Sequence, residues 1–192
     1  MHRRESLLVT AIEIIDELGI QALSIREIAK RQGMSEGTLF RHFKSKSELL
    51  LAVLDYFAQF DADITASVTL KKLPPLEAIR FFVRSYAVYY QNYPAITAIL
   101  LIFDVLRHEP ELAGKVHGIF NDRNRFMKEL VAAAQRAGAL RADIDGESLA
   151  DAIHGLIRFL CLKWRMEGYR FSLRERIEAG LEMLLSVFIT AP

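Results

Sequence analysis

The stretch SIREIAKRQGMSEGTLFRHFKSK, residues 24–46, decides the fold of this chain. It contains two short helical segments, and each follows a serine that can accept a hydrogen bond from the unpaired N–H groups at a helix start. These serines are Ser24 and Ser35. Gly33 lies between the segments, where a residue with positive φ ends one helix and turns the chain. The stretch therefore predicts a helix–turn–helix.

The second helix of this stretch is predicted to have two chemically different faces. At about 100° per residue, Leu39 and Phe43 lie on one face. Thr38, Arg41 and His42 lie on the opposite face. We expect the first face to pack against the protein and the second to contact a partner.

Basic residues exceed acidic ones between residues 26 and 46. Six basic and two acidic side chains give a local net charge of +4, in a chain whose formal total is +1. A phosphate backbone favours such an excess, because neutralising it releases condensed counterions. The six bases are Arg26, Lys30, Arg31, Arg41, Lys44 and Lys46.

Several residues of the second helix are suited to nucleic acid. Gly37 has no Cβ, so its backbone can approach a phosphate closely. Thr38 and His42 can donate to phosphate oxygens, and Arg41 can reach a guanine edge in the major groove with a bidentate fork. The alternative is a helical hairpin with a solvated basic face. A solvated hairpin explains the local excess of positive charge, but it does not explain why Gly37, Thr38 and His42 occur together.

Residues 23–50, LSIREIAKRQGMSEGTLFRHFKSKSELL, resemble the tetracycline-repressor (TetR) family of transcriptional regulators. The resemblance rests on the run G-T-L-[FY]-x-H-F-x-x-K and the upstream S-x-R-x-I-A, and beyond the first quarter of the chain it extends only to size and pattern. Phe40 stands where most relatives have Tyr, so one hydroxyl-to-phosphate bond is missing. By position, the resemblance implies phosphate contacts for Thr38, His42 and Lys46 and base or backbone contacts for Arg26 and Arg41.

Composition predicts a soluble, cytoplasmic protein. Its 192 residues are 52% hydrophobic and 26% charged, which is enough to bury a sizeable core. The longest apolar run, residues 98–103, is far shorter than the roughly 20 residues that span a bilayer, and MHRRES is followed by no signal-peptide region. The single cysteine, Cys161, predicts a buried thiol in a reducing compartment.

The rest of the chain also reads as helix, so we expect an all-α fold of about nine helices. An amphipathic helix over residues 6–18, ended by Gly19, completes a three-helix DNA-binding domain, residues 1–47. Arg3 and Arg4 precede it, and they either contact DNA or lie in solvent. The second domain, residues 48–192, is predicted to bind an effector and to form the dimer.

A long helix from Lys46 to about Ser67 is predicted to start with a capping box formed by Ser45 and Glu48. A shift of this helix would move the DNA-reading unit. Further helices are predicted at about residues 75–92, from Pro94 to 106, and at 111–137, 147–167 and 173–189.

The last two predicted helices carry broad apolar stripes. A second copy of the chain can cover them in a four-helix interface, and the TetR resemblance also implies a homodimer. Two recognition helices related by a two-fold axis would read a palindrome. The alternative is that both stripes face only the chain's own core. The predicted interface residues are Ile153, Leu156, Leu160, Leu181, Leu184 and Phe188.

Aromatic residues are dense in the helices between residues 46 and 137, where they can line a cavity for a small apolar or aromatic effector. The alternative is that they are plain core. The predicted pocket residues are Phe60, Tyr86, Tyr89, Phe103, His117 and Phe120.

No pattern of catalytic, metal-binding or cofactor-binding residues is present in the sequence. The histidines are scattered, and neither a Gly-rich phosphate loop nor a G-x-S-x-G run occurs. We therefore expect no enzyme. The helix–turn–helix, its basic face and the TetR resemblance instead imply a homodimeric repressor that binds double-stranded DNA at a palindromic operator and is released by a ligand. The alternative is a DNA-bound scaffold for protein interactions, of the same fold and without an effector. Ligand-dependent loss of operator binding separates the two.

Overall fold

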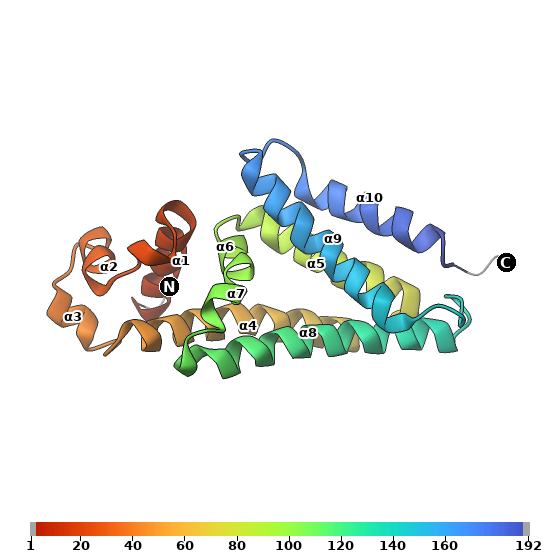
Figure 1. The fold of residues 1–192 in the computed structure, drawn as a ribbon, viewed down its shortest axis with the longest axis horizontal. Helices are drawn as coiled ribbons and strands as arrows, with labels where there is room; N and C mark the ends of the chain where they lie inside the picture. Colours follow the sequence, from red (N-terminus) through yellow and green to blue (C-terminus); the bar gives the residue numbers. More distant parts are fainter. Residues whose placement is uncertain (1–2, 190–192) are drawn as a thin grey trace. The chain divides into compact units, whose positions relative to one another are not determined.

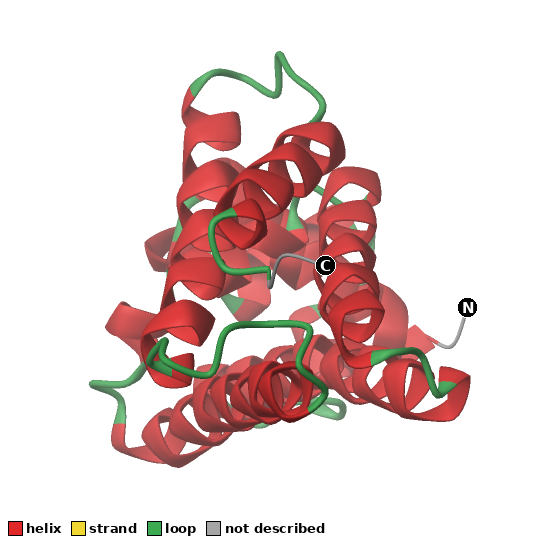
Figure 2. Ribbon diagram, turned by 90° about the vertical axis from the view of Figure 1, so that its right-hand side faces the viewer, coloured by secondary structure: helices red, strands yellow, loops and turns green. Residues whose placement is uncertain are grey.

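The structure is a computed structural model, and it describes residues 3–189. Within that range the chain folds into ten α-helices and one short 3₁₀ helix (Figures 1 and 2). The only β pairing among these residues is an isolated antiparallel bridge between Leu140 and Ile189. The prediction of an all-α fold is therefore confirmed.

The described chain divides into two compact units. One unit contains the chain up to Phe60 together with Tyr93–Ile119, and the other contains Asp61–Asn92 together with the chain from Phe120 onward. The functional boundary predicted after residue 47 is a different division and stays a prediction.

The first unit contains the predicted helix–turn–helix. In it α1 packs against α2 and against α6. Gln32 at the end of α2 donates through Nε2 to Thr10 Oγ1 in α1 at 2.6 Å, which fixes the two helices together. Its helices are α1 (Arg3–Leu18), η1 (Ile20–Ala22), α2 (Ile25–Arg31), α3 (Glu36–Phe40), the start of α4 (Lys46–Lys71), α6 (Ile96–Leu101), α7 (Phe103–Leu106) and the start of α8 (Pro110–Arg136).

The predicted helix caps of this unit are confirmed. Ser24 Oγ accepts from the amide of Glu27 at 3.1 Å, and Ser35 Oγ accepts from the amide of Thr38 at 3.2 Å. Gly33 has φ +62°, the left-handed conformation that turns the chain between α2 and α3.

The predicted capping box of α4 is confirmed in one of its two hydrogen bonds. Ser45 Oγ accepts from the amide of Glu48 at 3.0 Å. The carboxylate of Glu48 accepts from the amide of Lys44 at 2.7 Å, one residue before the expected donor. The helix also continues to Lys71 instead of ending near Ser67, since no proline interrupts the chain before Pro74.

The segment predicted as a single helix up to Leu106 is two helices, α6 and α7. Ile102 interrupts them with φ −91° and ψ 4°. No glycine or proline marks this break in the sequence.

The second unit is a packed set of long helices. Its α10 packs against α5 and α9. Gln91 Oε1, at the end of α5, accepts from the Ser172 hydroxyl at 3.1 Å and from the Arg174 amide at 3.0 Å, which fixes the start of α10. The helices besides the remainders of α4 and α8 are α5 (Pro75–Asn92), α9 (Gly146–Met166) and α10 (Leu173–Ser186).

Helix α10 is three residues shorter than predicted. It ends at Ser186 because the following residues pair with another segment: Phe188 accepts through its carbonyl from the Arg141 amide at 3.0 Å. None of the described helices combines the length and the hydropathy needed to cross a bilayer.

Candidate nucleic-acid interface

Helix α3 is shorter than predicted: it ends at Phe40, so Arg41, His42 and Phe43 lie on the turn that follows it and not on the helix. Leu39 and Phe43 are fully buried, with 0% of each residue exposed. Gly37 and Arg41 are exposed, while Thr38 and His42 are half-buried. The structure thus gathers the polar candidates on α3 and on the turn that follows it.

Thr38 is held in place by hydrogen bonds within α3. Its hydroxyl lies 2.9 Å from Ser35 Oγ, and its amide donates to the same oxygen. Arg41 Nη2 lies 3.4 Å from Thr38 Oγ1. Because this last contact is long and exposed, Arg41 can leave it for a base or a phosphate at little cost.

Nothing in the described packing of the chain requires glycine at position 37. A Cβ built there meets no atom nearer than Ser35 Oγ at 4.0 Å. Its φ is also not in the left-handed region. The absent side chain therefore leaves a bare stretch of backbone on the exposed face, where a phosphate can approach.

Most of the basic side chains of this region have no acidic partner among the residues that the structure describes. Arg31 is the exception, since it pairs with Glu17 at 2.8 Å and Glu27 at 3.2 Å. Hydrogen bonds to Glu17, and then to Glu27, raise the pKa of Arg31. The exposed side chains without an ion-pair partner among residues 3–189 include Arg26, Lys30 and Lys44.

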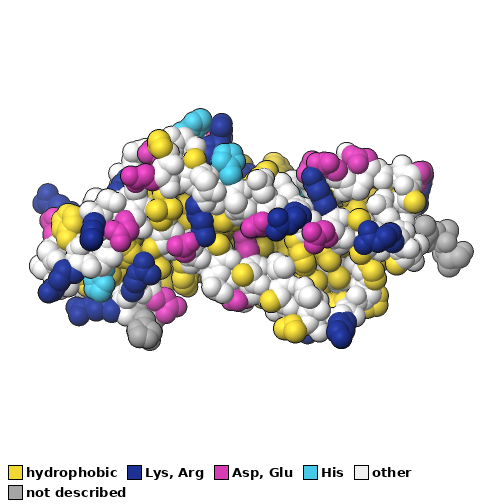
Figure 3. All heavy atoms as spheres, turned by 90° about the horizontal axis from the view of Figure 1, so that it is seen from below, with side chains coloured by type: hydrophobic (Ala, Val, Ile, Leu, Met, Phe, Trp, Pro, Cys, Tyr) yellow, Lys and Arg dark blue, Asp and Glu magenta, His cyan; other side chains and the backbone are white. Residues whose placement is uncertain are grey.

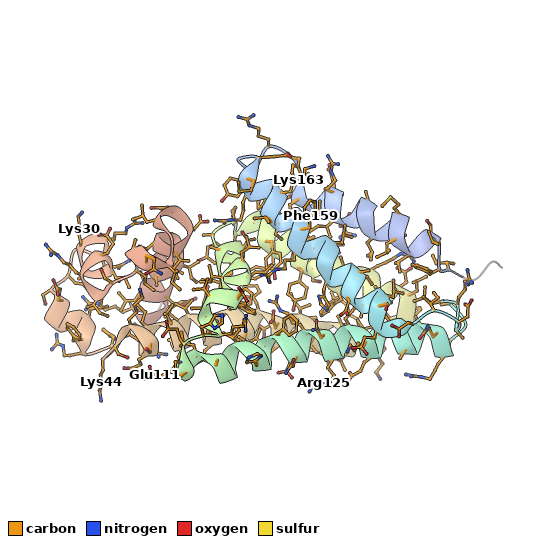
Figure 4. The ribbon with its side chains drawn as sticks, viewed as in Figure 1. Lys30, Lys44, Glu111, Arg125, Phe159 and Lys163 are labelled. Carbon is orange, nitrogen blue, oxygen red and sulfur yellow. The ribbon has the colours of Figure 1, made fainter. Side chains whose placement is uncertain are left out.

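The space-filling view shows where these charges lie. In Figure 3, Lys and Arg side chains gather at the left-hand end, which Figure 1 shows to be formed by α2 and α3. Figure 4 labels Lys30 and Lys44 at the same end of the molecule. The local charge excess thus lies on the surface of the first unit.

Lys46 begins α4 and also contacts η1. Its Nζ donates to the backbone carbonyl of Ile20 at 3.0 Å. An ammonium group has three donors, so the exposed Lys46 can hold this carbonyl and still bind a phosphate.

Arg3 and Arg4 lie within α1, and Arg4 stacks on the core of the recognition element. The guanidinium carbon of Arg4 lies 5.3 Å from the ring centroid of Phe43. This cation–π contact was not predicted, because nothing in the local sequence relates residues this far apart.

The predicted effector residues do not gather in one unit. Phe60, Phe103 and His117 belong to the first unit, whereas Tyr86, Tyr89 and Phe120 belong to the second. Phe103 is buried and makes an edge contact with Phe57 at 5.6 Å, while Phe60 is half-buried. Tyr86 and Tyr89 are buried.

His117 and Phe120 are exposed, and 52% of Phe120 is accessible. They lie on the outer face of α8, so within the described chain they line no enclosed pocket.

The second unit contains a buried polar cluster that was not predicted. Arg123 of α8 donates to both carboxylate oxygens of Asp61 in α4, through Nε at 2.6 Å and Nη2 at 2.6 Å. The Tyr86 hydroxyl of α5 donates to Asp61 Oδ1 at 2.8 Å. The side chains of Arg123 and Asp61 are only 11% and 15% exposed. The spacing of Arg123, four residues from both buried Ile119 and buried Met127, was the available signal.

His154 of α9 joins this cluster. Its imidazole makes a hydrogen bond with the backbone of Arg123, while its Nε2 is buried without a hydrogen-bond partner among the described residues. Burial, and then the nearby Arg123 charge, lower the pKa of His154 to about 4. His154 is therefore neutral near neutral pH.

We expect His154 to make the protein less stable in mild acid. The unfolded chain takes up a proton near the ordinary His pKa of 6.5, and the folded chain only near pKa 4, so stability falls as pH decreases through this window. The expected loss is roughly 2 kcal/mol between about pH 7 and pH 5. Urea unfolding of the wild type and of His154→Gln at both pH values measures it. A wild-type slope that persists unchanged in the variant would assign the effect to other groups.

Half of the predicted dimer residues are already buried by the chain itself. Ile153, Leu160 and Leu181 are at most 7% exposed within the single chain, so they belong to its core. Leu156 is half-buried because α10 packs on it: a Cβ at Gly180 would lie 2.8 Å from Leu156 Cδ1. Leu184 and Phe188 are also half-buried.

Other large apolar residues of α9 and α10 are well exposed. Phe159 is 62% exposed, and Figure 4 labels it on α9 beside Lys163. Such an exposed apolar surface does not stabilise a monomer. A partner that covers the surface removes it from water, which is favourable. The remaining exposed members are Leu162 and Met166 on α9, Met183 on α10 and Val187, the residue directly after α10.

Comparison with known proteins gives a match to a protein family in the part of the chain that contains this interface. The sequence model described as bacterial regulatory proteins, tetR family, matches residues 7–53. The chain is 22% identical over 181 residues to the fatty acid metabolism regulator protein of Bacillus subtilis, covering 92% of this chain and 90% of that protein.

Two solved structures share the fold over nearly all of the chain. The ketosteroid transcriptional regulator KstR2 of Mycobacterium tuberculosis superposes with a TM-score of 0.85 at 19% identity, covering 99% of this chain and 96% of that one. The transcriptional regulator FadR of Bacillus subtilis, solved in complex with stearoyl-CoA, superposes with a TM-score of 0.81 at 19% identity, covering 96% and 98%.

Proposed function

Because residues 7–53 match the sequence model of the tetR family, we propose that the chain is a repressor of this family that binds a palindromic operator as a homodimer and is released by a small, largely apolar ligand. The observation that carries the proposal is the exposed face of α3, where Gly37 and Arg41 lie among basic side chains without acidic partners. No contact among the described residues favours a scaffold without an effector.

In this proposal the first unit supplies the DNA contacts. The bare backbone at Gly37 and the hydroxyl of Thr38 approach a phosphate, and Arg41 enters the major groove. Phe40 is 47% exposed and offers apolar contact in place of a hydroxyl. The proposed DNA-binding residues are Arg26, Gly37, Thr38, Phe40, Arg41, His42 and Lys46.

The second unit supplies the dimer and the effector site. The exposed apolar residues of α9 and α10 form the proposed face for a second copy. Ile153 and Leu181 are buried in the same two helices. One structural neighbour is described as a ketosteroid transcriptional regulator, and the other was solved in complex with stearoyl-CoA. A ketosteroid and a stearoyl chain are both largely apolar. This supports an apolar effector for this chain.

Helix α4 is the proposed route from effector to DNA. It begins at Lys46 in the first unit and carries Asp61 in the second. A ligand shifts it only if the ligand binds one placement of α4 more tightly than another. Titrating a wild-type operator complex with the apolar fraction of a metabolite extract tests this step. Persistent binding at every concentration would contradict the effector part of the proposal.

We expect Arg41→Ala and Lys46→Ala to weaken DNA binding in different ways. Arg41→Ala removes a base contact, which should cost about 1 to 3 kcal/mol and relax base preference at one position. Lys46→Ala removes a phosphate contact, so it should weaken all sequences alike and lower the salt slope by about 1.

Fluorescence anisotropy across a salt series measures both effects. Arg136→Ala removes an exposed charge at the end of α8 and should change neither quantity. An unchanged salt slope in Lys46→Ala would remove the phosphate role of Lys46.

A further inference from the structure

The buried cluster of the second unit joins four helices through polar side chains. Asp61 comes from α4, Tyr86 from α5, Arg123 from α8 and His154 from α9. Burying two charges costs desolvation energy that apolar side chains of similar size avoid. Stability alone therefore does not account for the cluster, and buried groups of this kind are candidates for a binding role.

The hydrogen bonds of the cluster form a continuous chain from α9 to α4. The imidazole of His154 donates to the backbone carbonyl of Arg123. The guanidinium of Arg123 then donates to Asp61, which also accepts from Tyr86. A change at His154 thus reaches α4 through only one intervening residue.

The chemistry of His154 determines what can bind beside it. Nε2 has no partner among the described residues, so the imidazole proton that reaches the Arg123 carbonyl is on Nδ1. Because His154 is neutral, Nε2 carries a lone pair and accepts hydrogen bonds. A buried acceptor without a donor is costly, and a ligand that supplies the donor recovers that cost.

We propose that His154 Nε2 recognises the polar group of the effector, and that this group is a hydrogen-bond donor, either a hydroxyl or an amide N–H. The ligand class is an amphiphile with an apolar body and such a donor. A ketone, ether or carboxylate at the same place presents only lone pairs to Nε2 and is disfavoured. The inference rests on the proposed function, since it assigns the polar end of the effector site.

The same contact provides a physical link to α4. A donor on Nε2 fixes the orientation of the imidazole, whose other nitrogen holds the Arg123 backbone. Arg123 in turn holds Asp61 of α4, the helix that begins at Lys46. The effector therefore acts on the ion pair that positions α4.

A matched pair of probes tests the donor directly on the full chain. Decanol and its methyl ether have similar apolar bodies, but only decanol carries an O–H. We expect decanol to bind the wild type about tenfold more tightly in isothermal titration calorimetry. We also expect only decanol to move the His154 Nε2 resonance in nitrogen NMR of histidine-labelled protein.

Variants assign the preference to this side chain. His154→Leu should reduce the ratio of the two affinities to about one, and His154→Gln should restore part of it, because the amide oxygen is again an acceptor. His117→Leu is the matched control at an exposed histidine and should leave the ratio unchanged. Circular dichroism and a thermal melt of each variant establish that it is folded.

Three results would overturn the inference: equal wild-type affinity for the two probes, no binding of either, or a preference that survives in His154→Leu. An Nε2 resonance that does not respond to decanol would indicate ordered water at this position and would also overturn it. Each of these leaves DNA binding intact. Conversely, a His154-dependent preference without release of DNA by decanol would support the site and contradict its proposed role in repression.

Discussion

Met183→Asp will give a monomer that binds the operator about a hundredfold more weakly than the wild type. The reason is that two linked DNA-binding domains bind with an avidity that a single one lacks. Met183 lies on α10 and is 71% exposed in the single chain. The new carboxylate is solvated in the monomer but is forced into an apolar interface in the dimer. Sedimentation velocity measures the oligomeric state, and anisotropy with operator DNA measures the affinity.

The control for this experiment places the same charge elsewhere. Leu70 of α4 is 80% exposed, and Leu70→Asp should remain dimeric. Phe159→Asp on α9 should repeat the effect of Met183→Asp. Stable dimers of both interface variants would move the interface away from α9 and α10.

Arg123→Met will lower the free energy of unfolding by about 3 to 5 kcal/mol, because it leaves the Asp61 carboxylate buried without its partner. The side chain of Asp61 is 15% exposed, so little water reaches the charge. Urea unfolding followed by circular dichroism measures the loss.

Two further variants show that the loss comes from the ion pair. Arg125→Met removes a neighbouring arginine whose side chain is 69% exposed, and it should change stability by less than about 0.5 kcal/mol. The double variant Asp61→Leu with Arg123→Met should recover most of the loss, since no charge remains buried. If Arg123→Met were as stable as Arg125→Met, the buried pair would have no special role.

The parts of the fold that local sequence determines were predicted well. The bounds of α5 follow from the prolines at its two ends, Pro75 and Pro94. The caps at Ser24 and Ser35 follow from side chains that act within three residues. The interruption at Ile102 was not predictable in this way, because no residue there opposes a helix.

The candidate sites show the same difference between local and distant contacts. The α3 face was predicted because its residues are neighbours in the sequence. The ion pair of Arg123 with Asp61 joins residues 62 positions apart, and helical periodicity does not identify such a partner. On α9 the apolar stripe was found, but periodicity alone did not separate the buried Ile153 from the exposed Phe159.

Selection of bound fragments from random-sequence duplex DNA by the full-length protein is the most direct test of the account. We expect one enriched motif, an inverted repeat with half-sites about one helical turn or a small multiple apart, whose base preference relaxes in Arg41→Ala. Enrichment of no sequence, or of an unsymmetric sequence to which Arg41→Ala is indifferent, would contradict the claim that paired α3 helices read DNA.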